Sequence, residues 1–429
     1  MKKILSVIAG VAMMASTTAL AGNGDRFVDV IVSLKDASSP SMHASNRAAA
    51  ADFARGFGVS PRFTYGAVMS GFAASVPESR LEALRNHPRV QSVTIDAPVR
   101  AFAPPCHVTG TCGGGGGDGQ TIPWGIDRIG ATGNANTGAG VHVYVIDTGI
   151  DADHADLAAN ISNGFAAESC KGGSCMADWD DDHGHGTHVA GTVGALDNDI
   201  DVVGVAPEVT LHAVKVLNKR GSGSRSGVIA GIDWVTSQAV AMGQPVVANM
   251  SLGGSGSKTG TCTSSGFTGS DDYHRALCNA RNAGVVMAVA AGNESADAEG
   301  SVPAAYDDAV ITVSATSEGD DWAGFSNWGD NSASYMSSNS APVSIAAPGA
   351  GILSLSTGGG TTTMSGTSMA SPHVAGALAL IMASSSQSAD GSAFENLRST
   401  LLNAAEDTSS FSNTSGYPHD EDFLDAGSL

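Results

Sequence analysis

The sequence predicts an α/β fold, a three-layer parallel sheet with helices on both faces, preceded by a small α+β domain. From residue 120 onward, apolar runs alternate with segments of helical pattern, which is typical of a parallel sheet covered by helices. The apolar runs are nearly continuous, as expected for strands that are buried on both faces. Before residue 104 the predicted order is strand, helix, two strands, helix, strand, which indicates a split βαβ domain.

The chain begins with the pattern of an export signal. Met1-Lys-Lys precedes a short apolar run, and Ala19-Leu-Ala21 supplies small residues for cleavage, so we expect residues 1–21 to be a signal peptide. The run is too short to anchor a chain in a bilayer, and no later segment is apolar for long enough. The sequence therefore predicts a secreted, extracellular protein with no membrane anchor.

The small domain comprises residues 22–103. Its balance of 9 basic and 7 acidic residues gives +2, whereas residues 104–429, with 10 basic and 35 acidic residues, carry −25. So acidic a surface would repel phosphate, which argues against nucleic acid as a partner. The opposite charges suit docking of the small domain onto the large one. We predict strands at 26–35, within 63–76 and at 90–96, and helices at 41–57 and 78–86.

Residues 104–119 form a Gly-rich linker between the two domains, and its composition predicts flexibility. The chain has six cysteines, and cysteines in an exported protein point to disulfides. They lie in three pairs that are close in sequence, although the sequence alone leaves other connectivities open. A zinc site is less favoured, because no pair has a histidine at zinc-finger spacing. The simplest pairing is Cys106–Cys112, Cys170–Cys175 and Cys262–Cys278.

The large domain comprises residues 120–429 and holds the predicted parallel sheet. Its strands are expected at 141–146, 211–217, 246–251, 285–290, 310–314 and 343–346. Its helices are expected at 186–196, 224–242, 271–283, 368–383 and 393–404.

Ser368 lies in a stretch of small residues, Ser365-Gly-Thr-Ser-Met-Ala-Ser-Pro-His-Val-Ala-Gly376, which would let a substrate backbone approach its hydroxyl. The pattern turns helical from Met369, so Ser368 is placed at or near a helix N-terminus, where free N–H groups favour a developing oxyanion. Pro372 fits this placement, because proline is tolerated in the first helical turn. For an isolated serine, an N-cap on a core helix would be the simpler interpretation.

Two further stretches favour catalysis over a simple cap. Val143-Tyr-Val-Ile-Asp-Thr-Gly-Ile150 is an apolar strand that ends in Asp147, at the edge where open α/β sheets place their sites. Asp182-His-Gly-His-Gly-Thr-His-Val-Ala-Gly-Thr192 contains a Gly-flanked histidine, His185, that opens a helix. A serine hydroxyl needs a base to take its proton, and the base needs a buried acid to fix its tautomer.

Together these three motifs resemble the subtilisin family of serine proteases, in which the acid, the base and the nucleophile follow in this order. The resemblance implies Asp147 as the acid, His185 as the base and Ser368 as the nucleophile of a secreted serine endopeptidase made as a zymogen. It covers nearly everything after the signal, most specifically residues 120–380. It mixes features of the true subtilisins with features of the proteinase K branch.

The resemblance also implies the remainder of the active site. Val289-Ala-Ala-Gly-Asn293 matches the stretch that carries the oxyanion-hole asparagine, so Asn293 would act together with the Ser368 backbone N–H. An extended peptide substrate would pair with the edge strand in Val247-Ala-Asn-Met-Ser-Leu-Gly-Gly254. No acid is evident at the floor of the P1 pocket, which favours large apolar P1 residues. The pocket walls would be Ser251, Leu252 and Gly253 on one side and Ser301 and Val302 on the other.

Residues 22–103 resemble the prosegment that precedes such catalytic domains. The resemblance implies an intramolecular chaperone and inhibitor whose C-terminal tail lies in the active-site cleft. We expect maturation after Phe102, because cleavage before Pro104 is chemically awkward; a second candidate lies near Gly119. Protein and peptide substrates and the chain's own prosegment are thus the expected partners, and we expect a monomer.

A structural calcium ion is implied by six residues that match the tight calcium site of the family. Side chains and backbone carbonyls would supply oxygen ligands, which Ca²⁺ prefers. The alternative is a solvated acidic loop around residues 195–202. The six residues are Gln120, Asp156, Leu196, Asn198, Ile200 and Val202.

Three alternatives weigh less. A metal centre at His183, His185 and His188 lacks the H-E-x-x-H spacing, so we predict that His188 is a hydrogen-bonded helix residue and that His183 is exposed. An esterase of the α/β-hydrolase type would need G-x-S-x-G and a different triad order. A binding protein that lost activity is disfavoured because all the residues that the chemistry needs are present.

Overall fold

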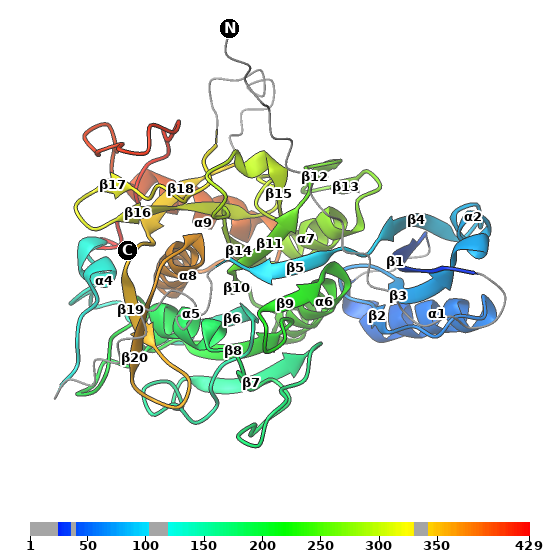
Figure 1. Cartoon of the computed structure of the whole chain (residues 1–429), viewed down its shortest axis with the longest axis horizontal. Coiled ribbons are helices and arrows are strands. Elements are labelled where there is room, and N and C mark those ends of the chain that lie inside the picture. The colour runs from blue at the N-terminus through cyan, green and yellow to red at the C-terminus, as the bar shows by residue number, and fades with distance from the viewer. Residues whose placement is uncertain (1–24, 36–39, 103–118, 330–341) are drawn as a thin grey trace, which may run out of the picture.

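Two domains of different size lie side by side in the computed structural model of the chain, which describes residues 25–35, 40–102, 119–329 and 342–429. The small N-terminal domain packs against one side of the large α/β domain (Figure 1). The predicted signal peptide, almost all of the linker, and Cys106 and Cys112 lie outside the described residues.

The small domain is a four-stranded antiparallel sheet with strand order β2-β3-β1-β4 and two helices. Strands β1 and β3 carry the apolar residues that pack under the helices and form their own core. This order and the helix positions confirm the predicted split βαβ domain. The elements are β1 (Phe27–Leu34), η1 (Pro40–Met42), α1 (His43–Gly56), β2 (Phe63–Tyr65), β3 (Gly71–Pro77), α2 (Glu78–Arg85) and β4 (Val90–Ile95).

The large domain is organised around a sheet of order β17-β16-β14-β10-β6-β8-β7, in which β18 also pairs with β16. All of its pairings are parallel except the one between β16 and β17. Its central strands are buried along their whole length, as the continuous apolar runs predict. The strands are β6 (His142–Asp147), β7 (Ile161–Ala166), β8 (Thr210–Lys215), β10 (Val246–Met250), β14 (Val285–Ala290), β16 (Ile311–Ser317), β17 (Asp321–Trp322) and β18 (Ile345–Pro348).

Helices cover both faces of this sheet and divide the core in two. On one face α5 and α8 pack with α9 against the odd-numbered valines of β6, and on the other α6 and α7 pack against Tyr144 and Ile146. Alternate residues of one strand thus face opposite helix layers, which confirms the three-layer architecture. The helices are α4 (Trp124–Arg128), α5 (His185–Gly194), α6 (Arg225–Met242), α7 (Asp272–Asn282), η2 (Ala298–Gly300), α8 (Thr367–Ser384) and α9 (Gly391–Ala404).

Apart from the edge strand expected within residues 247–254, short strands outside the main sheet were not predicted. They form a four-stranded sheet of order β15-β11-β5-β9 and two hairpins, β12-β13 and β19-β20. Because their lengths are 2–4 residues, no periodicity in the sequence could reveal them. They are β5 (Pro98–Ala101), β9 (Ser222–Ser224), β11 (Leu252–Ser255), β12 (Thr261–Thr263), β13 (Gly266–Thr268), β15 (Ser301–Val302), β19 (Ile352–Leu355) and β20 (Thr361–Met364).

Helix α8 differs from the prediction in one respect. It begins at Thr367, so Pro372 is its sixth residue and lies beyond the first turn, where a proline removes a helical hydrogen bond. The carbonyl that loses its donor is that of Ser368, four residues earlier. The Ser251 hydroxyl donates to this carbonyl at 2.8 Å, which compensates for the missing N–H.

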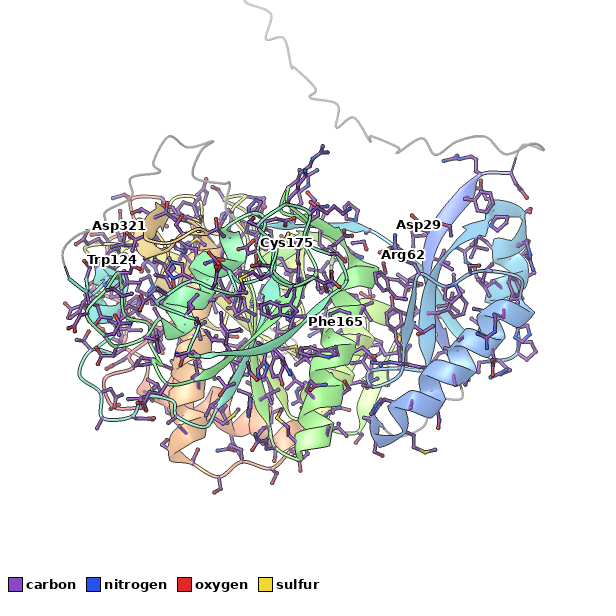
Figure 2. All side chains as sticks on the ribbon, turned by 90° about the horizontal axis from the view of Figure 1, so that it is seen from below. Asp29, Arg62, Trp124, Phe165, Cys175 and Asp321 are labelled. Carbon is purple, nitrogen blue, oxygen red and sulfur yellow. A yellow bond between two sulfur atoms is a disulfide. The ribbon has the colours of Figure 1, made fainter. Side chains whose placement is uncertain are left out.

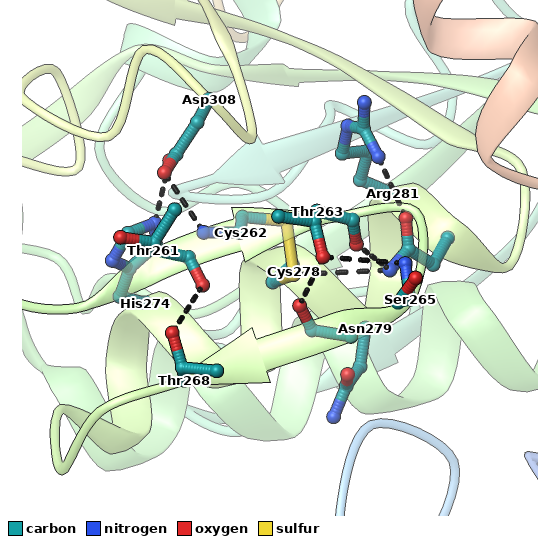
Figure 3. The surroundings of a disulfide bond; sticks show 12 residues. Thr261, Cys262, Thr263, Ser265, Thr268, His274, Cys278, Asn279, Arg281 and Asp308 are labelled. Atoms are coloured by element: carbon teal, nitrogen blue, oxygen red, sulfur yellow. Dashed lines mark hydrogen bonds and ion pairs between the residues drawn. A yellow bond between two sulfur atoms is a disulfide. The ribbon is translucent and has the colours of Figure 1, made fainter. Parts of the chain in front are cut away.

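Two of the three predicted disulfides lie within the described residues, and the structure forms both, Cys170–Cys175 and Cys262–Cys278. The second ties hairpin β12-β13 to helix α7 (Figure 3). Beside it Asp308 accepts hydrogen bonds from the Cys262 N–H and from His274 Nε2, which fixes the hairpin on the domain.

The small domain docks on helices α6 and α7 through two buried carboxylates of the large domain. Asp233 Oδ1 accepts hydrogen bonds from the three successive N–H groups of residues 66–68 at 2.6–2.9 Å, and its Oδ2 pairs with Arg47 at 2.6 Å. Asp272 accepts from the hydroxyls of Ser92 and Thr94. Hydrogen bonds to a charged group contribute about 1.5–3 kcal/mol each, so these carboxylates anchor the small domain.

Arg62 adds a polar link at the same interface, and it lies between the two domains in Figure 2. Its guanidinium bonds Asp96 of its own domain at 2.6 Å and the hydroxyl of Ser226 on α6 at 2.5 Å. Asp96 in turn accepts from the Ser226 N–H at the first turn of that helix. The charge complementarity expected from the sequence is therefore concentrated at a few contacts.

Candidate active site

Asp147 and His185 form a buried carboxylate–imidazole pair. Asp147 is the last residue of β6 and lies at the carboxyl edge of the sheet, and His185 is the first residue of α5. Asp147 Oδ1 accepts from His185 Nδ1 at 2.7 Å and from the Thr148 N–H at 2.7 Å. Both side chains are almost fully buried. The bond fixes the orientation of the imidazole and leaves its Nε2 as the ring nitrogen without a hydrogen-bond partner among the described residues.

The loop that precedes His185 is shaped by Asp181 and by a glycine. Asp181 Oδ1 accepts from the N–H groups of His183 and Gly184, and its Oδ2 accepts from the N–H and hydroxyl of Thr187. Gly184 has φ of 104°, a conformation that favours glycine. The Gly before the histidine is therefore a backbone requirement, which the sequence pattern already suggested.

Ser368 is the second residue of α8 and is fully buried. Its N–H has no acceptor within the helix, because the first N–H groups of any helix lack one. Its hydroxyl donates to the Ser251 carbonyl at 3.0 Å. His185 Nε2 has no hydrogen-bond partner among the described residues, so the Ser368 hydroxyl and the imidazole are not hydrogen-bonded to each other in this structure.

Asn293 follows β14 and lies between Ser368's helix and the tail of the small domain. Its Oδ1 accepts from the N–H and the hydroxyl of Thr367, at 2.9 and 3.0 Å. These two donors orient the amide so that Nδ2 faces outward. Nδ2 donates to the backbone carbonyl of Phe102. An amide donor aimed at a peptide carbonyl is the arrangement that stabilises an oxyanion.

The tail of the small domain lies in a cleft as an extended strand. In Figure 1 β5 leaves the small domain and runs between β9 and β11 of the large domain. It pairs antiparallel with both, Arg100 lying opposite Gly253 on one side and Ser222 on the other. The Ala101 N–H also donates to the Gly221 carbonyl at 3.0 Å. An extended peptide held at two edges is bound by strand addition.

A cavity of about 600 Å³ opens where the tail ends, and the Phe102 ring lines it. The ring lies so close to Gly253 that a Cβ added there would be 2.2 Å from it. Ser301 also lines the cavity, while Val302 is buried and pairs with Gly254. The Phe102 ring can therefore pack at this wall of the cavity only because residue 253 is glycine.

Of the five residues predicted to form the pocket, Gly253 and Ser301 line the cavity, whereas Ser251, Leu252 and Val302 are buried and do not. Ser251 holds Ser368 by two hydrogen bonds and is fully buried, so it positions Ser368 and does not line the cavity. Glu294 and Asp297, which the sequence did not single out, do line it. Asp297 caps η2 and Glu294 accepts from the Asn327 amide, so each carboxylate has a donor of its own.

The six candidate calcium ligands assemble around one loop. Gln120 Nε2 donates to the carbonyls of Leu196 and Val202 at 2.7 and 3.1 Å. Asn198 Nδ2 donates to Asp156 Oδ1 at 2.6 Å, and Ile200 joins through its N–H to Asn198 Oδ1 at 2.7 Å. Oxygen atoms of four residues thus accept hydrogen bonds from amide groups of this loop and of Gln120. The four residues are Asp156, Leu196, Asn198 and Val202.

The donor chemistry of this group fits a hard cation. Asp156 is fully buried, and burial raises the pKa of its carboxyl to about 6, so a nearby positive charge would favour its ionised form. In the part of the chain that the structure describes, no three His, Cys, Asp or Glu side chains cluster as ligands. Amide and carbonyl oxygens with a single carboxylate are ligands that suit Ca²⁺.

The other two histidines of the motif take structural positions. His188 Nε2 bonds the Ile352 carbonyl at 3.0 Å, and burial lowers the pKa of its imidazole to about 3. It is therefore neutral at pH 7 and holds α5 to β19, as predicted. His183 was expected to be exposed, but it is half-buried beside Gly221, because the loop folds back toward the cleft.

Several residues of the site were not found from the sequence. Thr367 orients Asn293, Thr148 supports Asp147, and residues 221–224 form the second edge for the tail. Their types are ordinary for a helix start or a loop, so only their neighbours in space give them a role. Lys215 had a signal, because a charged residue interrupts the apolar run Leu211-His-Ala-Val-Lys-Val-Leu217.

The fold and the arrangement at the sheet edge define a protease of the serine type that is made with an inhibitory N-terminal domain. Two family profiles match the chain: the subtilase family over residues 138–419, and the peptidase inhibitor I9 over residues 29–102. The chain belongs to the subtilase family.

Individual proteins agree with this assignment. The chain is 42% identical over 328 residues to the extracellular serine proteinase of Thermus sp. (strain Rt41A), covering 74% of this chain and 67% of that protein. It is 37% identical to proteinase R of Parengyodontium album, covering 74% and 71%. The crystal structure of a cold adapted subtilisin-like serine proteinase matches with a TM-score of 0.56 at 36% identity, covering 71% of this chain and 97% of that one.

Proposed function

We propose that this subtilase is an exported zymogen that hydrolyses peptide bonds through an acyl-enzyme formed on Ser368. The Ser368 hydroxyl attacks the scissile carbonyl carbon, and His185 Nε2 takes its proton while Asp147 steadies the imidazolium. The proton then passes to the leaving amine, and water repeats the sequence to release the acid. The hydrogen bond between Asp147 and His185 supports these roles.

The observation that carries the proposal is the bond from Asn293 Nδ2 to the Phe102 carbonyl. It marks the Phe102–Ala103 peptide as the bond at which an oxyanion would develop, with the Ser368 N–H as the second donor. The tail would therefore be the first substrate of the enzyme and afterwards its inhibitor. The Asp233 and Asp272 contacts would keep the small domain docked after cleavage.

Phe102 also supports a preference for large apolar P1 residues. Its ring packs against Gly253 at the wall of the cavity. An aromatic side chain buries about 150–250 Å², so an aromatic P1 residue packed in this way would contribute strongly to binding.

Labelling the secreted protein with a sulfonyl fluoride while following casein hydrolysis tests this function. We expect loss of hydrolysis, an adduct on Ser368, and a mature chain whose N-terminus is Ala103. An esterase would be labelled but would leave casein intact, and a binding protein would do neither. A mature N-terminus near Gly119 would move the maturation site without changing the reaction.

We further propose that Ca²⁺ binds at the Asp156 loop and stabilises the fold. The bound ion would supply a positive charge among the oxygens of Gln120, Asp156, Leu196, Asn198 and Val202, where amide hydrogens now converge. It would neutralise the buried carboxylate and hold the segment that precedes α4 against the loop that follows α5. It takes no part in the chemistry at Ser368.

Chelation by EGTA is expected to shorten the half-life of the mature enzyme at elevated temperature without stopping turnover at once. A ligand stabilises the folded state by about 2.7 kcal/mol when its concentration is 100 times its dissociation constant. Asp156→Asn should abolish the calcium response. Asp178→Asn, which removes the same charge from an exposed side chain of another loop, should retain it. Immediate and complete loss of activity with EGTA would indicate a catalytic metal instead.

A further inference from the structure

Lys215 is a fully buried lysine at the centre of the large domain, and the chemistry described above does not use it. It is the last residue of β8 and lies directly opposite Asp147 of β6 in the sheet. An isolated ammonium in such a position would be costly, because burial removes its hydration. The hydrogen bonds of its Nζ therefore indicate which segments of the domain the charge stabilises.

The ammonium has three partners on three different segments. It donates to the carbonyl of Thr148, to Asp182 Oδ1 at 2.6 Å, and to the carbonyl of Leu217 at 3.1 Å. Thr148 is the residue whose N–H donates to the Asp147 carboxylate. Asp182 belongs to the loop that leads to His185. The one ammonium group thus binds both the residue that follows Asp147 and the loop that precedes His185.

The third partner connects the ammonium to the substrate edge. Both the Val216 and the Leu217 N–H groups donate to the Asp147 carbonyl, at 2.9 and 3.1 Å, so the turn after β8 is fixed on the catalytic strand. This turn continues to Gly221, whose carbonyl accepts from the Ala101 N–H, and then to β9, which pairs with the tail. The position of this edge relative to Asp147 is set within the turn.

Asp182 is itself held by the loop that the Cys170–Cys175 disulfide closes. Its Oδ2 accepts from the Lys171 N–H at 2.8 Å, while its Oδ1 is bonded to the ammonium. The disulfide-closed loop therefore orients the Asp182 carboxylate toward the buried charge. This gives the disulfide-closed loop a role that its sequence did not indicate.

We propose that Lys215 and Asp182 are a positioning pair that sets the substrate edge at residues 221–224 relative to the catalytic Asp147. The inference rests on the proposed peptidase function and names a specificity role within it. Without the pair, the edge shifts and peptide residues P2–P4 lose their alignment, whereas a substrate with a P1 residue alone is affected less. The effect of the pair is measured as the ratio of kcat/KM for a long peptide substrate to kcat/KM for a short one.

The test compares acetyl-Val-Arg-Ala-Phe p-nitroanilide, which repeats residues 99–102, with acetyl-Phe p-nitroanilide, using mature enzyme quantified by active-site titration. We expect Asp182→Asn to lower the ratio of the two kcat/KM values about tenfold, because small misplacements are costly in catalysis. Asp182→Glu, which keeps a carboxylate, should restore part of the ratio. A merely destabilising change would lower both values together.

Asp307→Asn is the matched control. Asp307 forms an ion pair with Lys258 at the same 2.6 Å, and neither residue lines the cavity or pairs with the tail, so its loss should leave the ratio unchanged. If Asp182→Asn does not accumulate as folded enzyme, the double variant Cys170→Ala, Cys175→Ala tests the proposal in its place. This variant keeps the charges of Lys215 and Asp182 but no longer holds Lys171 in position. We expect a smaller fall of the ratio there.

A ratio within about twofold of the wild-type value in the folded variant would overturn the proposal, because a tenfold loss follows from a lost alignment. Wild-type enzyme that cleaves neither anilide would instead contradict the proposed peptidase function. The two failures are therefore distinguishable by the wild-type measurement alone.

Discussion

Replacing Ser368 with alanine is expected to abolish peptidase activity and to leave the chain uncut between Phe102 and Ala103. Removing the nucleophile of a serine protease lowers kcat on the order of 10⁶-fold, since the acyl-enzyme can no longer form. The Ala side chain fits the buried site, and the Ser251 bond to the carbonyl of residue 368 does not depend on the hydroxyl. Intact mass of the secreted protein and casein hydrolysis measure the two effects.

Ser371→Ala is the matched control for this variant. Ser371 lies one turn further along α8, is fully buried, and donates to Asn249 Oδ1 at 2.7 Å. Its loss should lower stability but allow maturation and turnover. Ser368→Ala protein that still matures, free of any added protease, would show that another group is the nucleophile.

Asn293→Leu is expected to lower kcat by about 10²–10³-fold with little change in KM, because its Nδ2 donor acts on the oxyanion more than on the bound peptide. Leucine has a similar volume and keeps the loop filled, but it offers no donor to the Phe102 carbonyl. Steady-state kinetics on the tetrapeptide anilide, normalised by active-site titration, measure the change.

Thr367→Val provides a graded comparison. It removes one of the two donors to Asn293 Oδ1 and leaves the backbone N–H at 2.9 Å. The amide keeps its orientation in part, so a much smaller fall in kcat is expected than for Asn293→Leu. Equal losses in both variants, or a loss confined to KM, would argue against the oxyanion role of Asn293.

The regular elements of this chain were predictable because their signals are local. The continuous apolar runs identified six strands of the main sheet, and β14 has the predicted bounds. Close spacing also predicted the two disulfides within the described residues. Helix α8 shows the limit of local signals: Pro372 suggested a later start, whereas Ser251 replaces the lost donor and allows the helix to begin at Thr367.

The site was predictable where a residue's type and immediate neighbours determine its chemistry. Small-residue motifs surround four residues of the candidate site, and such motifs can be recognised in a single sequence. The four residues are Asp147, His185, Asn293 and Ser368. The apolar run around Lys215 marked this residue as unusual, but its role could not be predicted in the same way. Its partners come from three segments, and whether a lysine is buried depends on acceptors that converge only after folding.

The sequence by itself determined the parallel α/β domain, the small domain before it, and the residue types that the reaction needs, because apolar periodicity and short motifs act over a few residues. Only the tertiary structure decided that Phe102 meets Asn293, that Asp233 anchors residues 66–68, and that Asp182 and Lys215 pair. These contacts join segments far apart in the chain. Their energies come from burial and hydrogen bonding between partners that no local pattern connects.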